Sequence, residues 1–245
     1  MSIQSLCTIR GNFTIVSKEV LLMSTLRIRY STIEFKRFDI HVRTLRDNQQ
    51  FADPHGEALK LGISSATWPY FGIIWKSGTY LAFLMEDYPI RGKRILEIGC
   101  GVGLASLVLN HRGADITATD YHPEANSFLD KNTSLNEDPA ISFIQTDWQE
   151  LASTSLGFFD LLIGSDLLYE RTHPEKLATF INQHAQPHCT VIIVDPGRGY
   201  ISKFTKHMND FGFGRSPNRT PPVEVNPDEF TGSALCFSRA SERDV

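Results

Sequence analysis

The chain has 245 residues, of which 41% are hydrophobic and 21% are charged, and its formal net charge is −4. This composition is ordinary for a globular protein that forms one domain with an extension. The mild negative charge argues against a broad nucleic-acid surface, and no apolar run reaches the roughly 20 residues that span a bilayer. We therefore expect no nucleic-acid partner and no membrane association.

The cysteines are scattered, at Cys7, Cys100, Cys189 and Cys236. No pair has the spacing of metal ligands, so we expect neither a metal site nor a disulfide framework. A reducing, cytoplasmic setting fits this pattern best.

Three regions are predicted along the chain. Residues 1–22 lack the clean apolar core of a signal peptide, and we expect a poorly ordered lead, with Met23 as an alternative start. Residues 23–62 are expected to form a β extension and a linker, because apolar and polar residues alternate over 26–43 and the stretch that follows is polar, with proline and glycine. Residues 63–245 are expected to form one α/β domain.

In the third region, strand patterns alternate with helix patterns. The strands are expected over 94–98, 116–119, 141–145, 159–164, 191–194 and 233–238, and the helices over 68–88, 103–111, 123–135, 173–184 and 201–211. Pro123 is expected in the first turn of its helix, where a missing N–H costs nothing. Strands and helices that alternate at these lengths predict βαβ units around a parallel sheet.

The most informative run is Glu97-Ile98-Gly99-Cys100-Gly101-Val102-Gly103, which joins a predicted strand to a predicted helix. A glycine turn lets a ligand press against the backbone, and the free N–H groups of a helix start favour polar or negative ligand atoms. Asp120 follows about 20 residues later, where such folds place an acid for ribose hydroxyls. This combination predicts a nucleoside-bearing cofactor, against the alternative that the glycines serve packing alone.

The glycine spacing discriminates among such cofactors. Gly103 comes one residue too early for the dinucleotide fingerprint, and Leu104 stands where that fingerprint needs a small residue, so an NAD-dependent oxidoreductase is disfavoured. No P-loop motif is present. The run resembles motif I of the seven-strand S-adenosyl-L-methionine-dependent methyltransferases, whose acid before the glycines suits a sulfonium cofactor. The resemblance implies S-adenosyl-L-methionine as the cofactor and a Rossmann-like seven-strand sheet with helices on both faces.

Several residues fall at or just past the ends of predicted strands, namely Gly99, Asp120, Asp147, Asp166 and Asp195. Ligands in open α/β sheets bind at the carboxyl ends of the strands. We therefore expect these acids to gather on one edge of the sheet, where the chemistry takes place.

The run Ser165-Asp166-Leu167-Leu168-Tyr169-Glu170 follows a buried strand. It resembles the Asp-x-x-Tyr/Phe motif of the lysine-specific protein methyltransferases, which include the electron-transfer-flavoprotein and valosin-containing-protein lysine methyltransferases. The resemblance implies that Asp166 and Tyr169 are the catalytic residues. The carboxylate can hold and orient an amine, and the tyrosine ring can offer its face to it. The alternative is an aspartate that caps the next turn and a tyrosine in the core.

Two other segments are similar to the same subgroup. In Trp68–Gly78 the resemblance implies a tryptophan over the cofactor, and Trp75 is the candidate, against a place in a helix core. In Asp195-Pro196-Gly197-Arg198 the arginine could contact an acidic substrate surface, close the site or serve only the turn.

Asp147 and Trp148 follow the third strand of the sheet, where a carboxylate can accept from an exocyclic amine and an indole can stack on a purine. In the family this position holds the adenine, and the alternative is a tryptophan in ordinary core contact. We expect His122 on the surface, with a place near the cofactor as the alternative, and His173 at a helix start. The expected cofactor-binding residues are Trp75, Glu97, Gly99, Cys100, Gly101, Gly103, Asp120, Tyr121, Asp147, Trp148 and Ser165.

The predicted function is transfer of methyl groups from S-adenosyl-L-methionine to a lysine side chain on a protein partner. The oligomeric state is open, and a monomer is compatible with the sequence. One alternative is a methyltransferase for a small amine, such as a nicotinamide-like ring nitrogen, which a deep closed pocket would favour. Another is a non-catalytic module that binds the cofactor, or no cofactor, and serves a partner. An open, acidic-edged groove would favour the protein substrate.

Overall fold

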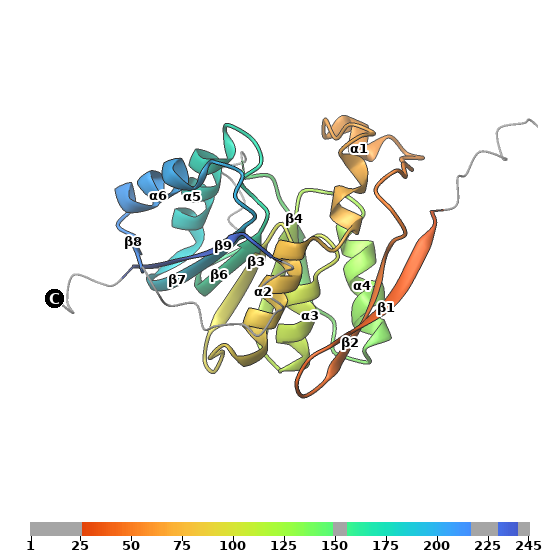
Figure 1. The fold of residues 1–245 in the computed structure, drawn as a ribbon, viewed down its shortest axis with the longest axis horizontal. Helices are drawn as coiled ribbons and strands as arrows, with labels where there is room; N and C mark the ends of the chain where they lie inside the picture. Colours follow the sequence, from red (N-terminus) through yellow and green to blue (C-terminus); the bar gives the residue numbers. More distant parts are fainter. Residues whose placement is uncertain (1–25, 149–155, 217–229, 240–245) are drawn as a thin grey trace, which may run out of the picture.

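The computed structural model describes residues 26–148, 156–216 and 230–239 (Figure 1). The predicted lead over residues 1–22 lies outside these ranges. The strands are β1 Ile28–Glu34, β2 Asp39–Leu45, β3 Arg94–Ile98, β4 Asp115–Asp120, β5 Ser142–Gln145, β6 Phe159–Ser165, β7 Ala185–Asp195, β8 Gly214–Arg215 and β9 Ser233–Arg239. The helices are α1 Glu57–Lys60, α2 Lys76–Asp87, α3 Leu104–His111, α4 Ala125–Leu135, α5 His173–His184 and α6 Ile201–Asp210, with a 3-10 helix, η2, over Trp68–Gly72.

Seven strands form one sheet in the order β5-β4-β3-β6-β7-β9-β8. The first five are parallel, and β9 runs antiparallel to both β7 and β8. The central strands β3 and β6 and the second half of β7 are mostly apolar, as expected of parallel strands that are covered on both faces. The predicted seven-strand α/β sheet is confirmed.

Successive side chains of the central strands feed two separate cores, because strand side chains alternate between the two faces. Ile95 and Leu161 pack into one core with α2, α3 and α4, whereas Leu96 and Leu162 pack into the other with α5 and α6. Helices therefore cover both faces of the sheet, as predicted (Figure 1).

The predicted N-terminal β extension is a hairpin of β1 and β2 that lies against α4 (Figure 1). Two asparagines of α4 bind the backbone of β2. Asn136 accepts from His41 N and donates to His41 O, both at 2.8 Å, and Asn132 does the same with Arg43 at 2.6 and 3.3 Å. The two asparagines are one helical turn apart and their partners are two residues apart on β2. These spacings are similar, because one helical turn rises about 5.4 Å and two strand residues span about 6.6 Å.

Several predicted boundaries were wrong. The expected helix over 68–88 is interrupted, because the chain is extended at Ile73 and again at Trp75, which becomes the residue before α2. Pro123 precedes α4 instead of standing in its first turn, since the helix begins after Glu124. The predicted linker contains the single turn α1, and β8 was missed because it has only two residues.

β7 begins at Ala185 instead of 191, directly after α5. Its polar first half, which includes Gln186 and His188, hides the strand pattern. Within the described ranges, no helix has the length and apolar character needed to cross a membrane.

Candidate active site

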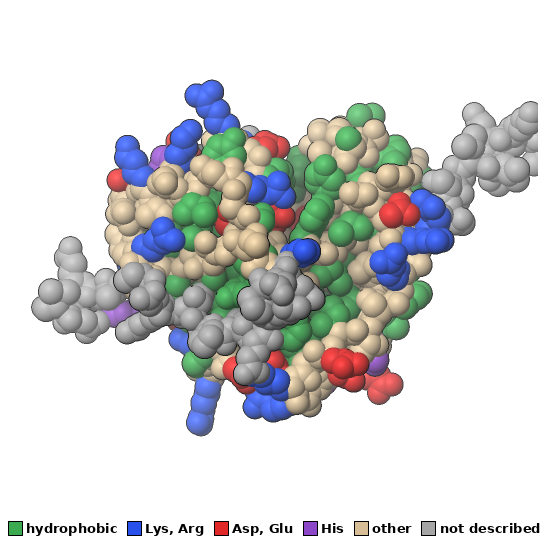
Figure 2. Space-filling model, viewed as in Figure 1, with side chains coloured by type: hydrophobic (Ala, Val, Ile, Leu, Met, Phe, Trp, Pro, Cys, Tyr) green, Lys and Arg blue, Asp and Glu red, His purple; other side chains and the backbone are tan. Residues whose placement is uncertain are grey.

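A cavity of about 790 Å³ opens at the carboxyl ends of β3, β4 and β6. Figure 2 shows the surface hollowed between the side that carries α5 and α6 and the side that carries α1. Every residue predicted to bind cofactor or substrate lines this cavity, with the exception of Gly103. The sheet thus brings together side chains that are far apart in the sequence.

The glycine turn is shaped by close contacts with its neighbours. Gly101 has φ +56°, and a Cβ atom there would lie 2.8 Å from the carbonyl oxygen of Phe71. Its N–H donates to Asp120 Oδ2 at 2.8 Å, while Asp120 Oδ1 accepts from His122 N at 2.8 Å. Burial raises the pKa of Asp120, against the effect of these backbone hydrogen bonds. The acid and the turn therefore form one backbone-bonded unit.

Gly103 stands outside the cavity lining. It is the residue before α3 and has φ +80°, and a Cβ atom there would collide with Leu129. For this glycine the structure shows the packing role that the sequence left as an alternative.

Glu97 has its carboxylate fully buried at the end of β3. Oε2 accepts from Ser106 N at 2.8 Å and also from the Ser106 hydroxyl. Gly103 has no side chain to cap α3, so the Glu97 carboxylate satisfies a first-turn N–H of that helix. Burial raises the pKa of Glu97 to about 7, the Ser106 hydrogen bonds oppose this shift, and the charge of Asp120 adds to it.

Aromatic side chains line much of the cavity. Trp75 donates from Nε1 to the carbonyl of Tyr70 at 3.0 Å, and the two rings meet edge to face at 5.6 Å. The Tyr121 hydroxyl donates to the carbonyl of Leu61 in the linker. Trp148 lies edge-on to His173, with ring centroids 5.3 Å apart. Trp75 is therefore a cavity residue and not part of the core of a helix.

His122 is buried, and its predicted surface position was wrong. Its ring stacks on Phe71 at 3.9 Å and lies edge-on to Trp68. Nδ1 accepts from Glu124 N at 3.1 Å, and burial lowers the pKa of His122 to about 3. The aromatic run that begins at Trp68 was the sequence signal for these aromatic contacts. Its contact with His122 is a tertiary contact, which the sequence pattern does not indicate.

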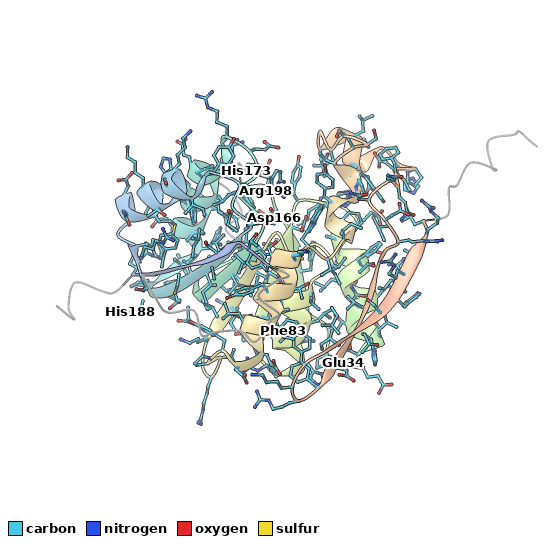
Figure 3. The ribbon with its side chains drawn as sticks, in the orientation of Figure 1. Glu34, Phe83, Asp166, His173, His188 and Arg198 are labelled. Atoms are coloured by element: carbon cyan, nitrogen blue, oxygen red, sulfur yellow. The ribbon has the colours of Figure 1, made fainter. Side chains whose placement is uncertain are left out.

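Asp166 occupies a left-handed backbone conformation, with φ +55°, where non-glycine residues are uncommon. Its carboxylate is paired with Arg198, from Nε to Oδ1 at 2.5 Å and from NH2 to Oδ2 at 2.9 Å. Figure 3 shows Asp166, Arg198 and His173 in one group. The Arg198 guanidinium therefore places a positive charge beside the expected catalytic carboxylate. The sequence did not predict this ion pair.

Asp195 lies at the end of β7, on the edge of the sheet where the acids were expected. It does not line the cavity, and its buried carboxylate faces the turn that follows β7. Oδ1 accepts from Gly197 N at 2.7 Å and from Arg198 N at 3.1 Å. Asp195 therefore shapes the loop that presents Arg198.

Tyr169 lies at the rim of the cavity and is 51% exposed. Its ring meets His173 edge to face at 4.4 Å. Partial burial, followed by the charges of Asp120, Glu170 and Asp166, raises the pKa of Tyr169 to about 12. The hydroxyl is thus neutral throughout the ordinary pH range. His173 stands at the start of α5, as predicted.

The family described as lysine methyltransferase matches residues 61–210. The chain belongs to this lysine methyltransferase family. The match begins at the linker residue whose carbonyl binds Tyr121 and ends with α6, so it includes the whole described lining of the cavity. The resemblance read from motif I and the Asp-x-x-Tyr run is confirmed.

Curated relatives of this chain share about a third of the aligned residues with it. The electron transfer flavoprotein beta subunit lysine methyltransferase of Xenopus laevis is 30% identical over 138 residues, which cover 55% of each chain. Protein N-lysine methyltransferase METTL21A of Danio rerio is 31% identical over 141 residues, 53% of this chain and 63% of the relative. The chain spans about half the length of the curated relatives it matches.

Solved structures share the fold of this chain at low sequence identity. A 16S rRNA methyltransferase of T. thermophilus aligns with a TM-score of 0.55 at 15% identity, over 87% of this chain and 51% of that one. The magnesium protoporphyrin IX methyltransferase of Synechocystis aligns with a TM-score of 0.51 at 22% identity, over 67% of this chain and 78% of that one.

The cavity fits S-adenosyl-L-methionine in its chemistry. It combines a glycine backbone without side chains, a buried carboxylate at Glu97, a half-buried one at Asp120, and the indoles of Trp75 and Trp148. Backbone N–H groups and carboxylates suit an amino acid and ribose hydroxyls, and indoles suit a purine. Among the described residues, no cluster of three or more His, Cys, Asp or Glu is placed to hold a metal ion.

Proposed function

We propose that this protein is an S-adenosyl-L-methionine-dependent methyltransferase that acts on a lysine ε-amine of a protein substrate. The observation that carries the proposal is the position of Asp166 and Tyr169 in the same cavity as the glycine turn and Asp120. Membership of the lysine methyltransferase family supports it.

The residues that would hold the cofactor are those that line the inner part of the cavity. The turn at Gly99 and Gly101 admits the cofactor close to the backbone, and Asp120 would accept from the ribose hydroxyls. Trp148 and Asp147 would hold the adenine, and Trp75 would cover it. The remaining proposed contacts are Glu97, Cys100, Tyr121 and Ser165, with Gly103 as a support for the turn.

The protein's own contribution to the reaction is placement. When bound, S-adenosyl-L-methionine supplies an electrophilic methyl group, so the amine lone pair forms the new N–C bond while the S–C bond breaks and its electron pair stays on sulfur. Asp166 would orient the amine through its carboxylate, and Tyr169 would confine it with its ring. In-line approach of a held nitrogen accounts for a large part of such rate accelerations.

The rim of the cavity favours a large acceptor over a small one. Tyr169 and Tyr70 are 51% and 44% exposed, so the opening is not closed by these rings. Glu170, Lys176 and Arg198 place both signs of charge near it, so the groove is not purely acidic. An open rim of this kind supports a protein substrate more than a nicotinamide-like small amine.

Cys100 and Cys189 are buried free thiols, and Cys236 is also buried. A reducing compartment keeps thiols in this state, and we propose the cytoplasm as the site of action. The name of one relative specifies its acceptor as an electron transfer flavoprotein beta subunit. For this chain we propose only that the methyl acceptor is a protein that bears a lysine.

The test is transfer of a radiolabelled methyl group from S-adenosyl-L-methionine into a lysate of the source organism, with macromolecular and small-molecule fractions counted separately. Wild type should label a protease-sensitive band. Asp166→Ala should lower labelling by about 100-fold, because the amine loses its orienting group, while calorimetry shows unchanged cofactor affinity. Asp130→Ala, at an exposed position on α4, is the matched control.

Label confined to the small-molecule fraction would contradict the protein substrate. Equal loss of cofactor affinity and labelling in Asp166→Ala would contradict the role of the carboxylate. An absence of both labelling and cofactor binding in the wild type would leave only a partner module.

A further inference from the structure

The two ends of one ion pair come from different strand ends of the sheet. Asp166 follows β6, and Arg198 follows β7, which is the neighbouring strand. Asp166 N donates to Val194 O at 2.8 Å, which extends the β6–β7 ladder and fixes the carboxylate beside the β7 turn. The same turn is closed by Asp195, so both partners are held by the backbone.

The pairing uses both oxygens of the carboxylate. Two parallel N–H···O bonds of this kind are the strongest arrangement that arginine makes with a carboxylate. The Asp166 side chain is 11% exposed and the Arg198 side chain 42%, so the carboxylate is shielded and the guanidinium reaches toward solvent at the rim. Hydrogen bonding to Asp166 raises the pKa of Arg198, which keeps it charged.

The reaction needs the substrate lysine without its proton, and the negative charge of Asp166 alone would favour the protonated form. Methyl transfer needs a neutral lysine nitrogen, yet the ordinary lysine pKa is about 10.4. A shielded carboxylate without a partner would bind the ammonium form and raise this pKa further. A carboxylate that is already neutralised by a guanidinium can still accept a hydrogen bond from a free amine, but it no longer stabilises the ammonium.

We propose that Arg198 is a positioning residue that neutralises Asp166 and so makes the site select the free amine of the substrate lysine; this inference rests on the proposed function. Arg198 acts through Asp166 and gives no group to the reaction. The nitrogen that enters has therefore lost its proton to water before the N–C bond forms. Arg198→Lys would keep the positive charge but lose the pair of parallel hydrogen bonds to Asp166.

Other charged and titratable groups near the pair also act on the amine. They are Asp120 from β4, Tyr169 and Glu170 from the loop after β6, His173 and Lys176 from α5, and Asp195 from β7. His173 Nδ1 donates to Leu167 O at 2.8 Å, and its Nε2 lies 3.4 Å from Glu170. Because these groups stay in place when Arg198 is replaced, the change in pH dependence reports the guanidinium.

The first experiment compares pH profiles of kcat and kcat/KM for wild type, Arg198→Gln and Arg198→Lys, with the acceptor protein found by labelling. Arg198→Gln should move the alkaline rise of kcat by about one to two pH units upward, because the ammonium is now stabilised. At neutral pH its kcat should fall about tenfold or more and recover at high pH. Arg198→Lys should keep most of the wild-type profile.

Lys206→Gln is the matched control, since it removes one positive charge from an exposed position on α6 outside the cavity lining. Cofactor affinity, measured by calorimetry, should be the same in all four proteins. An unshifted profile for Arg198→Gln would overturn the inference. A lower KM and a higher rate at neutral pH would overturn it as well, because they would show that Arg198 competes with the substrate.

A second experiment needs no turnover and separates this inference from the proposed function. Binding of N-acetyl-lysine methylamide is followed by NMR with S-adenosylhomocysteine present. In wild type its affinity should increase with pH, and in Arg198→Gln it should be higher at neutral pH and nearly independent of pH. Equal pH dependence in both proteins would overturn the inference even in an active enzyme. The expected difference in a protein without transferase activity would overturn the proposed function alone.

Discussion

The Glu97 carboxylate accepts from the backbone N–H of Ser106, nine residues further along the chain, at 2.8 Å. This contact joins the end of β3 to the first turn of α3 across the glycine turn. The pKa of Glu97 is raised from 4.5 to about 7, chiefly by burial. A contact that is needed to hold the turn is therefore also a source of pH-dependent stability.

Glu97→Gln should change the pH dependence of unfolding. The pKa of Glu97 in the folded protein lies above its value in the unfolded chain. Glu97 therefore contributes its full stability to the folded state below about pH 4.5, and this contribution is lost as the pH rises through about 7. Between about pH 5 and pH 7.5 the wild type should lose about 2 kcal/mol relative to the variant. Urea unfolding at both pH values measures this, and parallel pH slopes in the two proteins would refute it.

His122→Phe should have the opposite effect. The folded pKa of about 3 lies below the ordinary 6.5, so His122 contributes stability above pH 6.5 that is lost as the pH falls toward 3. From about pH 7 to pH 5 the wild type should lose about 2 kcal/mol relative to the variant, whose ring can still stack on Phe71. The same unfolding series checks this. The idea fails if acidification affects both proteins equally.

Strong hydrophobic periodicity made much of the fold predictable. β3 and α5 have the predicted bounds, because their apolar patterns are unbroken and their neighbours end them abruptly. The aromatic segment from Trp68 to Trp75 was misjudged, since its residues turn inward for tertiary reasons and not in a helical period. The polar start of β7 was missed for the converse reason, because its composition carries no strand signal and only Ala185 pairs with β6 before the register shifts.

The site was predictable where it depends on strand ends. Asp120 and Asp166 could be placed together because parallel strands deliver their carboxyl ends to one edge. The ion pair of Asp166 with Arg198 was not predictable, because it depends on a left-handed residue and on the Asp195 turn. The burial of His122 was not predictable either, because it depends on tertiary contacts with Trp68 and Phe71 that no local pattern signals.

Gly101→Ala should weaken cofactor binding more than it weakens the fold. A Cβ atom at Gly101 would meet the Phe71 carbonyl at 2.8 Å in a left-handed conformation. Gly92→Ala is the control, because Gly92 has φ +70° but no atom within 4 Å of the added Cβ. Gly92→Ala should lose about 1 kcal/mol of stability from the backbone strain, and Gly101→Ala should lose more, because of the added contact with the Phe71 carbonyl. Calorimetry with S-adenosyl-L-methionine should show a loss of about tenfold or more only for Gly101→Ala, and equal affinities would count against the turn as the cofactor site.

Asn132→Ala should destabilise the protein more than Asn136→Ala. Asn132 is fully buried, binds both backbone groups of Arg43 and also donates to Val102 O at 3.0 Å, so it ties the hairpin to the glycine turn. Its loss leaves several buried groups unpaired and should cost about 3 kcal/mol. Asn136 binds His41 at a more exposed position and should cost about 1 kcal/mol. Urea unfolding ranks the two variants, and cofactor affinity should fall only for Asn132→Ala. A reversed ranking would mean that the hairpin is held mainly by its apolar face and not by this pair of asparagines.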